Sequence, residues 1–270
     1  MELVDTHCHI QSAGAKGGER TTQAIWAKQP SLTSKVLVKN AVNANVTRLI
    51  VVGCDLPDSR LACEFVSDTP NTWASIGIHP HEAKDYAHDV ALKQQFSELV
   101  SRPKVVAIGE CGLDYYYNHS NKDDQIEVLQ FQIELAHKHN LPLIFHVRDA
   151  FEDFWPIFDK YPHIRGVLHS FTDNMGNLEK AIERNLMIGV NGIATFAKKP
   201  EQLEVYCSVP LENLVLETDA PFLTPIPHRG TINEPKYISE VASYLAHLKG
   251  TTLNSIAEYS TRNAIKLFGL

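Results

Sequence analysis

Short apolar segments recur along the whole chain and alternate with segments whose pattern is helical. The apolar segments lie at residues 2–4, 46–53, 73–78, 104–109, 142–146, 165–169, 187–190 and 213–217. Because they are apolar on both faces and separated by helices, they are typical of buried parallel strands. We therefore predict eight short strands that belong to one parallel sheet.

The intervening segments predict helices at about 33–45, 58–67, 87–101, 123–140, 150–161, 175–185, 199–206, 234–248 and 252–268. Residues 11–30 are different: they are rich in Gly, Ala, Lys, Thr and Gln, contain Gly17-Gly18 and end at Pro30, so we predict a loop there. No Pro/Gly-rich linker divides the chain, which predicts a single domain over residues 1–270.

Eight strand–helix units in 270 residues predict a (β/α)8 barrel, also called a TIM barrel. A doubly wound open sheet is the alternative. That fold is disfavoured because no G-x-G-x-x-G motif follows the first strand.

Polar residues with metal-binding side chains fall where the predicted strands end. They are His7 and His9 after strand one, His79 and His81 after strand three, Glu110 after strand four, His146 at the end of strand five, His169 at the end of strand six, and Glu217 and Asp219 after strand eight. In a parallel barrel all of them lie at the carboxyl-terminal rim, where barrel active sites are built.

Each of these residues has a purely structural explanation when taken alone. His146 or His169 would bond a backbone carbonyl, Glu110 would be a loop carboxylate or a helix cap, and Asp219 would fix the turn before Ala220-Pro221. Their shared position is not explained in this way. Neutral imidazoles together with a carboxylate that can bridge two cations predict a two-metal hydrolase site.

Composition limits the classes of protein that fit. Apolar content of 44% and charged content of 21% are ordinary for a globular chain, and the net charge of −7 does not by itself indicate nucleic-acid binding. A nucleic-acid partner would have to be held by metal ions and a local cluster of cations. The five cysteines are odd in number and form no CxxC pair, which fits a reducing cytosol. The absence of a long apolar run or a signal-like start predicts a cytoplasmic protein without a membrane span.

The motifs, taken together, resemble the TatD-related deoxyribonucleases, a branch of the metal-dependent amidohydrolase-like barrels. The matching segments are residues 5–9 (DTHCH), 77–81 (GIHPH), 107–115 (AIGECGLDY), 143–150 (LIFHVRDA), 166–171 (GVLHSF), 216–223 (LETDAPFL), and Arg229-Gly230 with Asn233-Glu234-Pro235. The resemblance extends from residue 3 to about 268. Residues 11–30 look longer and more polar than the connection expected after the first strand of this family, which concerns the substrate range.

The resemblance implies a complete set of metal ligands. One metal would be held by His7, His9, Glu110 and Asp219, and the other by Glu110, His146 and His169, with Glu110 as the bridge. The cofactors expected are two divalent metal ions. Oxygen ligands favour Mg²⁺ or Mn²⁺ for activity, whereas four histidines suit Zn²⁺ or Ni²⁺.

The function expected from this site is that of a metal-dependent phosphodiesterase, a deoxyribonuclease acting exonucleolytically on DNA ends or single strands. In such a site a metal-activated hydroxide attacks phosphorus, Asp219 orients the water or accepts its proton, and Glu110 bridges the metals. His79 is the expected phosphate or leaving-group contact, with His81 less so, because a Pro-braced turn explains the latter equally well.

Other rim residues have two interpretations each. The planar fork of Arg148 suits a phosphate, and a salt bridge with Asp149 explains it equally well. The run Tyr115-Tyr116-Tyr117 suits stacking on unpaired bases or, equally, packing beside an exposed rim. Glu217 is interpreted as a carboxylate that orients a metal ligand.

Two other function classes stay open. The first is hydrolysis of a different ester or amide bond, such as that of a D-aminoacyl-tRNA or a lactone, which the acidic net charge modestly favours. The second is a non-catalytic adaptor on an inactive barrel, and the intact ligand set argues against it. The expected partner is DNA as a substrate, with no obligate protein partner.

Overall fold

A computed structural model describes residues 2–15 and 19–270, and its centre is one sheet of eight parallel strands. The strands are β1 (Leu3–Cys8), β2 (Val46–Val52), β3 (Thr72–Ile76), β4 (Val105–Asp114), β5 (Leu143–Arg148), β6 (Gly166–Leu168), β7 (Met187–Val190) and β8 (Leu214–Leu216). Each strand pairs with the next in chain order, and all seven pairings are parallel.

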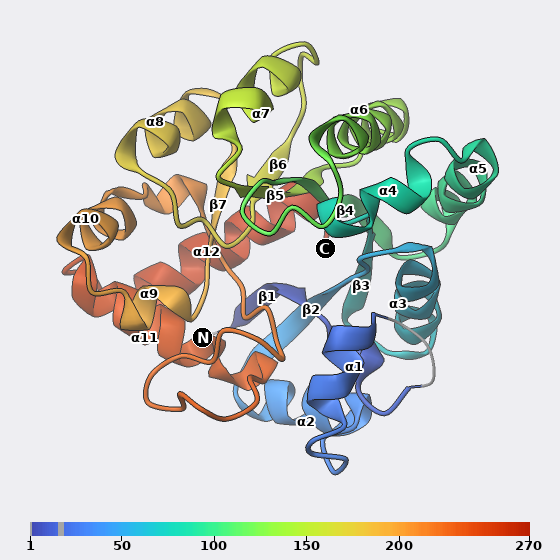
Figure 1. Ribbon diagram of the computed structural model, residues 1–270. Helices are drawn as coiled ribbons and strands as arrows, with labels where there is room; N and C mark the ends of the chain where they lie inside the picture. The colour runs from blue at the N-terminus through green and yellow to red at the C-terminus, as the bar shows by residue number, and fades with distance from the viewer. Residues whose placement is uncertain (1, 16–18) are drawn as a thin grey trace.

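Helices surround the strands (Figure 1). They are α1 (Arg20–Trp26), α2 (Ser34–Asn43), α3 (Leu56–Asp68), α4 (Ala83–Tyr86), α5 (Val90–Glu98), α6 (Lys122–His139), α7 (Phe151–Phe158), α8 (Met175–Glu183), α9 (Ile193–Phe196), α10 (Pro200–Ser208), α11 (Ile238–Leu248) and α12 (Leu253–Phe268). Short 3-10 helices lie at Ile10–Ser12, Pro80–Glu82, Leu99–Ser101, Leu211–Asn213 and Pro235–Tyr237. Among the described residues, no helix combines the length and the apolar character that crossing a membrane requires.

The first and last strands meet and nearly close the barrel. Cys8 forms an isolated parallel bridge with Ala220, and the Asp219 and His9 amides donate to the His7 and Ala220 carbonyls, each over 2.8 Å. The (β/α)8 barrel predicted from the sequence is therefore confirmed. The join also brings the end of β1 beside the segment that follows β8, so residues more than 200 positions apart become neighbours.

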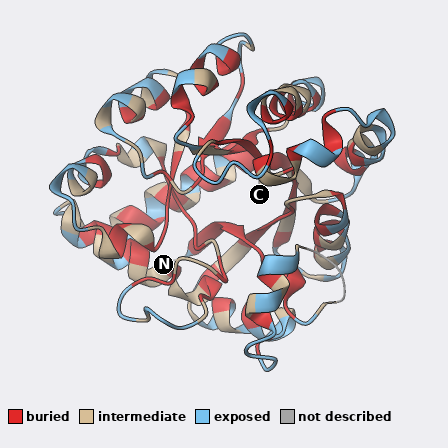
Figure 2. Cartoon of the chain, in the orientation of Figure 1, coloured by how far each residue is buried: buried red, intermediate tan, exposed pale blue. Residues whose placement is uncertain are grey.

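The apolar core has two parts, one outside the strands and one inside the barrel. The inner part consists of Val4, Ile50, Val52, Ala107, Ile144, Val167 and Val215 with Ala264, Leu267 and Phe268 from α12. Residues of so many different strands can contact one another only within the barrel, and α12 closes its amino-terminal end. Figure 2 shows this arrangement as buried strands surrounded by helices whose outer faces are exposed. The interior is thus apolar at the amino end and leaves the carboxyl end for polar side chains.

Some predicted boundaries were wrong. Residues 11–30 are not only a loop: the chain forms a 3-10 helix at Ile10–Ser12 and α1 at Arg20–Trp26, while part of the predicted loop, including Gly17-Gly18, lies outside the described residues. Helix α1 is anchored because the buried indole of Trp26 donates to the His9 carbonyl over 3.1 Å. Strand β4 continues to Asp114, so Glu110 lies within the strand and does not follow it.

Candidate metal centre

Strand alternation places three of the polar residues inside the barrel. Side chains two positions apart in a strand share a face. His146 follows the interior residue Ile144 by two positions, and His169 follows the interior residue Val167 in the same way. These histidines therefore stand above the inner core. Glu217 follows Val215 by the same spacing, and it is buried too.

Glu110 does not follow this rule. It lies three positions after the interior residue Ala107, so a regular strand would turn it outward. The pairing of β4 with β5 shifts register between Ile108 and Cys111, and such an irregularity re-aims the side chain within it. Strand β1 has a register shift between Asp5 and Cys8, the segment that contains His7. Glu110 and His7 therefore both lie in segments where the pairing with the neighbouring strand is irregular.

The carboxylate of Glu110 lies between two groups of imidazoles. Its Oε2 lies 3.4 Å from His7 Nε2. Its Oε1 lies 2.8 Å from His146 Nδ1, 3.7 Å from His79 Nε2 and 3.8 Å from His169 Nε2. Each oxygen therefore faces a different set of nitrogen donors, which is the arrangement that a bridging carboxylate needs.

The first set of donors comes from the join between β1 and β8. His7 Nε2 and His9 Nε2 lie 3.3 Å apart, and Asp219 Oδ1 lies 3.7 Å from the former and 3.3 Å from the latter. The ring of His169 stacks on that of His7 with centroids 3.6 Å apart, and its Nε2 lies 4.0 Å from Asp219 Oδ1. Close groups of possible ligand atoms include His7, His9 and Glu110, and also His7, His169 and Asp219.

The hydrogen bonds of these imidazoles fit a divalent cation. His9 Nδ1 lies 2.8 Å from the Val52 carbonyl, which can only accept, so Nδ1 carries the proton and a neutral His9 presents the Nε2 lone pair to the cluster. His169 Nδ1 lies 3.0 Å from Glu217 Oε1. This distance suits an ion pair, but the angles do not suit a hydrogen bond. Lone pairs and carboxylates that converge from several elements are the donors that a divalent metal requires.

Asp114 organises the second set of donors. Its Oδ2 accepts from His146 Nε2 over 2.9 Å and from His81 Nε2 over 3.1 Å. Its Oδ1 accepts from the backbone amides of Tyr116 and Tyr117 over 3.0 and 2.9 Å. Because Asp114 holds the Nε2 proton of His146, the Nδ1 of this imidazole is left to face Glu110. A second close group of possible ligand atoms comprises His79, Glu110 and His146.

The pKa shifts in the cluster go in two directions: burial lowers the pKa of His7 and holds that of His79 well below its usual value, whereas the carboxylates raise the pKa of other imidazoles. Burial opposes ionisation of Glu110, but the charges of His79 and His169 outweigh it and hold the pKa of this carboxyl well below its usual range. Burial lowers the pKa of His169, yet the charges of Glu217 and Glu110 raise it to about 10. For His9 the hydrogen bond with Asp219 overcomes burial and raises the pKa to about 9. The carboxylates therefore create a negative potential that a bound cation can balance.

Most of these donors form the floor of an open cavity of about 610 Å³ at the carboxyl end of the barrel. Its walls include Glu19 just before α1, Thr22 within α1, Arg148 at the end of β5, Tyr117 after β4 and Phe222 after β8. A volume of this size is typical of small-molecule sites and accommodates the end of a polymer.

Comparison with known proteins agrees with this geometry. A family model described as TatD related DNase matches residues 4–269. The chain belongs to the TatD-related DNase family. A relative in Bacillus subtilis, named uncharacterized metal-dependent hydrolase YabD, is 38% identical and covers 98% of this chain and 98% of its own length.

Two further TatD relatives bear on function and fold. The Shigella flexneri protein named 3'-5' ssDNA/RNA exonuclease TatD is 32% identical over 87% of this chain and 92% of its own length. The crystal structure of the TatD homolog YjjV from Escherichia coli has a TM-score of 0.87 at 25% identity, and covers 99% of this chain and 98% of that one. This chain is thus a TatD-family metal-dependent hydrolase with candidate metal-binding groups.

The structure brings the sequence-predicted residues of this TatD-related site together. The six predicted ligands, His7, His9, Glu110, His146, His169 and Asp219, lie close together, and their role as ligands stays a prediction. All of them except the fully buried His7 line the cavity. His79, predicted as a substrate contact, lies among the donors beside Glu110, whereas Arg148 lies at the rim. Asp114 was missed as an organising residue, because the predicted strand ended at residue 109 and only the structure extends β4 to Asp114.

Proposed function

We propose that this TatD-related protein is a metal-dependent phosphodiesterase that removes nucleotides from the ends of single-stranded DNA. The observation that carries the proposal is Glu110, whose two oxygens face two separate groups of imidazoles. The name of the Shigella flexneri relative, an ssDNA/RNA exonuclease, supports the substrate class. The proposal includes two divalent cations, Mg²⁺ or Mn²⁺ for activity, and a cytoplasmic location.

The proposed ligands divide between two positions that share Glu110. His7, His9 and Asp219 would hold one cation, and His146 and His169 the other. Bound divalent cations would supply an acidified water and the positive charge that balances a phosphate in its transition state. The protein contributes fixed donors: the Val52 carbonyl orients His9, and Asp114 orients His146.

Asp219 is the proposed proton acceptor. Its side chain is 15% exposed and lines the cavity, whereas that of Glu110 is 6% exposed. Burial raises the pKa of Asp219, but the hydrogen bond with His9 and the charge of His169 lower it below its usual value. An ionised carboxylate at the cavity floor can orient the attacking water and take its proton. His79 and Arg148 are the proposed contacts to the leaving group and to a neighbouring phosphate.

The test measures nucleotide release from 5'-labelled single-stranded DNA in the presence of Mg²⁺ or Mn²⁺. We expect Glu110→Gln to lower kcat/KM by more than about 100-fold and to reduce the bound metal, since even ligand-orienting residues contribute 10- to 100-fold. Glu179→Gln makes the same chemical change at an exposed position of α8 and should have no effect. Wild-type activity in Glu110→Gln would refute the site. D-Aminoacyl-tRNA and simple lactones belong in the same panel, because hydrolysis of these alone would refute the nuclease assignment.

A further inference from the structure

The turn after β4 presents two neighbouring aromatic side chains to solvent beside the metal centre. Tyr116 is 59% exposed and Tyr117 is 50% exposed. Tyr115, the first residue of the run, is different: its hydroxyl donates to Asp153 over 2.8 Å, and Lys122 lies 4.0 Å from its ring centroid. The three tyrosines therefore differ: the hydroxyl of Tyr115 is held by Asp153, whereas Tyr116 and Tyr117 are largely exposed to solvent and pack edge to face on each other with ring centroids 4.9 Å apart. The ring of Tyr117 also lies near those of His81 and His119, so Tyr116 offers the more open face.

A cation accompanies the two exposed rings. The guanidinium carbon of Arg148 lies 4.3 Å from the centroid of the Tyr116 ring and 4.8 Å from that of Tyr117. Arg148 and Tyr117 both line the cavity that contains Glu110 and His146. We call Tyr116, Tyr117 and Arg148 the platform. It combines stacking faces with a cation, the two features that bind single-stranded nucleic acid without sequence preference.

The platform is mechanically tied to the metal centre through Asp114. One oxygen of this buried carboxylate holds the Tyr116 and Tyr117 amides, and the other holds the candidate ligand His146. The position of the turn is therefore set by the same group that orients a ligand.

The neighbouring sector of the rim has the opposite charge. Glu19 and Glu82 line the cavity on the side of β1 and β3. Both oxygens of Glu19 accept from backbone amides at the start of α1, over 2.7 and 2.6 Å, which lowers the pKa of this carboxyl despite its partial burial and keeps it ionised. Phosphates are repelled from this sector, so the β4–β5 sector is the one that suits a polyanion.

We propose that the platform holds the body of a single DNA strand by stacking on its bases, while the terminal phosphodiester lies over the metal centre. This inference rests on the proposed nuclease function and adds which side of the site carries the strand. Binding in this way requires unpaired nucleotides, because the faces of bases within a duplex are covered by neighbouring bases and cannot stack on the two rings.

The experiment compares two DNA strands of equal length, one of normal nucleotides and one with tetrahydrofuran abasic residues that keep the phosphates but lack bases. For the wild-type protein we expect kcat/KM to be about tenfold or more higher on the normal strand, since base stacking on aromatic side chains commonly contributes that much. The double variant Tyr116→Leu/Tyr117→Leu should remove this preference, mainly through KM, while cleavage of the abasic strand stays at the wild-type rate.

The chain offers a matched control. Arg262 lies over the ring of Tyr259 on α12, with 4.3 Å between guanidinium carbon and ring centroid, and α12 closes the other end of the barrel. Tyr259→Leu should leave both rates unchanged. Unchanged metal content and circular dichroism of the platform variant show that the site is intact. An equal wild-type rate on both strands, or a preference that survives the double substitution, would overturn the platform. Failure of the wild type to cleave either strand would instead overturn the proposed function.

Discussion

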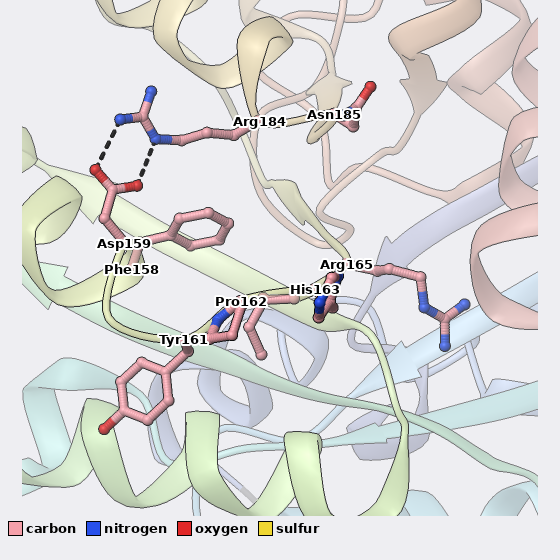
Figure 3. Close-up of a pocket in the computed structure, with 9 residues that line it drawn as sticks. Phe158, Asp159, Tyr161, Pro162, His163, Arg165, Arg184 and Asn185 are labelled. Carbon is pink, nitrogen blue, oxygen red and sulfur yellow. Dashed lines mark hydrogen bonds and ion pairs between the residues drawn. The ribbon is translucent and has the colours of Figure 1, made fainter.

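Both ends of the barrel carry a cavity lined by charged side chains, but the two ends differ in what those side chains can do. At the amino end, the α7–β6 and α8–β7 connections line a cavity of about 500 Å³ with Asp159, Tyr161, His163, Arg165 and Arg184 (Figure 3). Its size is close to the 610 Å³ of the cavity at the carboxyl end. Volume therefore does not distinguish the two ends.

The two ends differ in how their charged side chains are paired and in how deeply these side chains are buried. At the amino end, two nitrogens of Arg184 donate to the two oxygens of Asp159, each over 2.7 Å, and the Asp159 side chain is 48% exposed. At the carboxyl end, Glu110 and Asp219 meet several imidazoles in a buried cluster. An exposed pair neutralises itself and is solvated, whereas buried donors that converge require a cation.

The direction of the strands explains the difference. The inner core ends at the amino side with Ala264, Leu267 and Phe268 of α12, so polar groups there have no access to the barrel interior. At the carboxyl side, the residues that follow the core positions project inward from several strands to a common point. The candidate metal centre is a consequence of that convergence.

Removal of the metal should have the largest effect, and that effect should be confined to the carboxyl end of the barrel. We expect a chelator to abolish hydrolysis and Mg²⁺ or Mn²⁺ to restore it. Saturation at 100 times Kd should stabilise the fold by about 2.7 kcal/mol. Hydrogen exchange should slow in peptides that contain Glu110 and His146, and stay unchanged over residues 158–165. Equal protection at both ends would contradict a single metal centre at the carboxyl end.

Asp114→Asn should have the next largest effect. Asp114 uses both oxygens as acceptors, whereas asparagine has only one. If that oxygen keeps the Tyr116 and Tyr117 amides, the NH2 group faces His146 Nε2, cannot accept its proton, and the ring loses its orientation. We expect metal affinity and kcat/KM to fall by about 10- to 100-fold, measured by calorimetric metal titration and strand cleavage. Asp123→Asn, at an exposed position of α6, is the control. A variant with wild-type metal affinity would show that Asp114 serves the turn alone.

Arg184→Ala at the amino end should have the smallest effect. The hydrogen bond from Arg184 lowers the pKa of Asp159, so the pair stabilises the fold above the unfolded pKa and loses this contribution as the pH falls through the folded pKa. Because the pair is exposed and screened, we expect a loss below about 1 kcal/mol at pH 7, and none in activity. Denaturant unfolding at pH 7 and pH 3 measures it. A difference from wild type that is larger at pH 3 would contradict this sign.

Much of the site was predictable because strand periodicity and strand ends are properties of the local sequence. The positions of His146 and His169 at the ends of apolar segments already place both at the carboxyl-terminal rim of a barrel. Glu110 was selected because of its residue type and its position after an apolar segment, but its inward direction depends on the register shift between β4 and β5. No local pattern predicts such a shift, because it arises from pairing with another strand.

The whole molecule shows the same difference between what local sequence patterns predict and what the pairing of distant segments decides. By itself the sequence determined the eight strand–helix units, the rim on which the polar residues lie and the identity of the candidate ligands, since each follows from the polarity of neighbouring residues. Only the tertiary structure decided that α1 stands in the predicted loop, that Asp114 links the tyrosine turn to His146, and that His79 lies among the donors. Those contacts join segments far apart in the chain, and their geometry is settled only when the barrel closes.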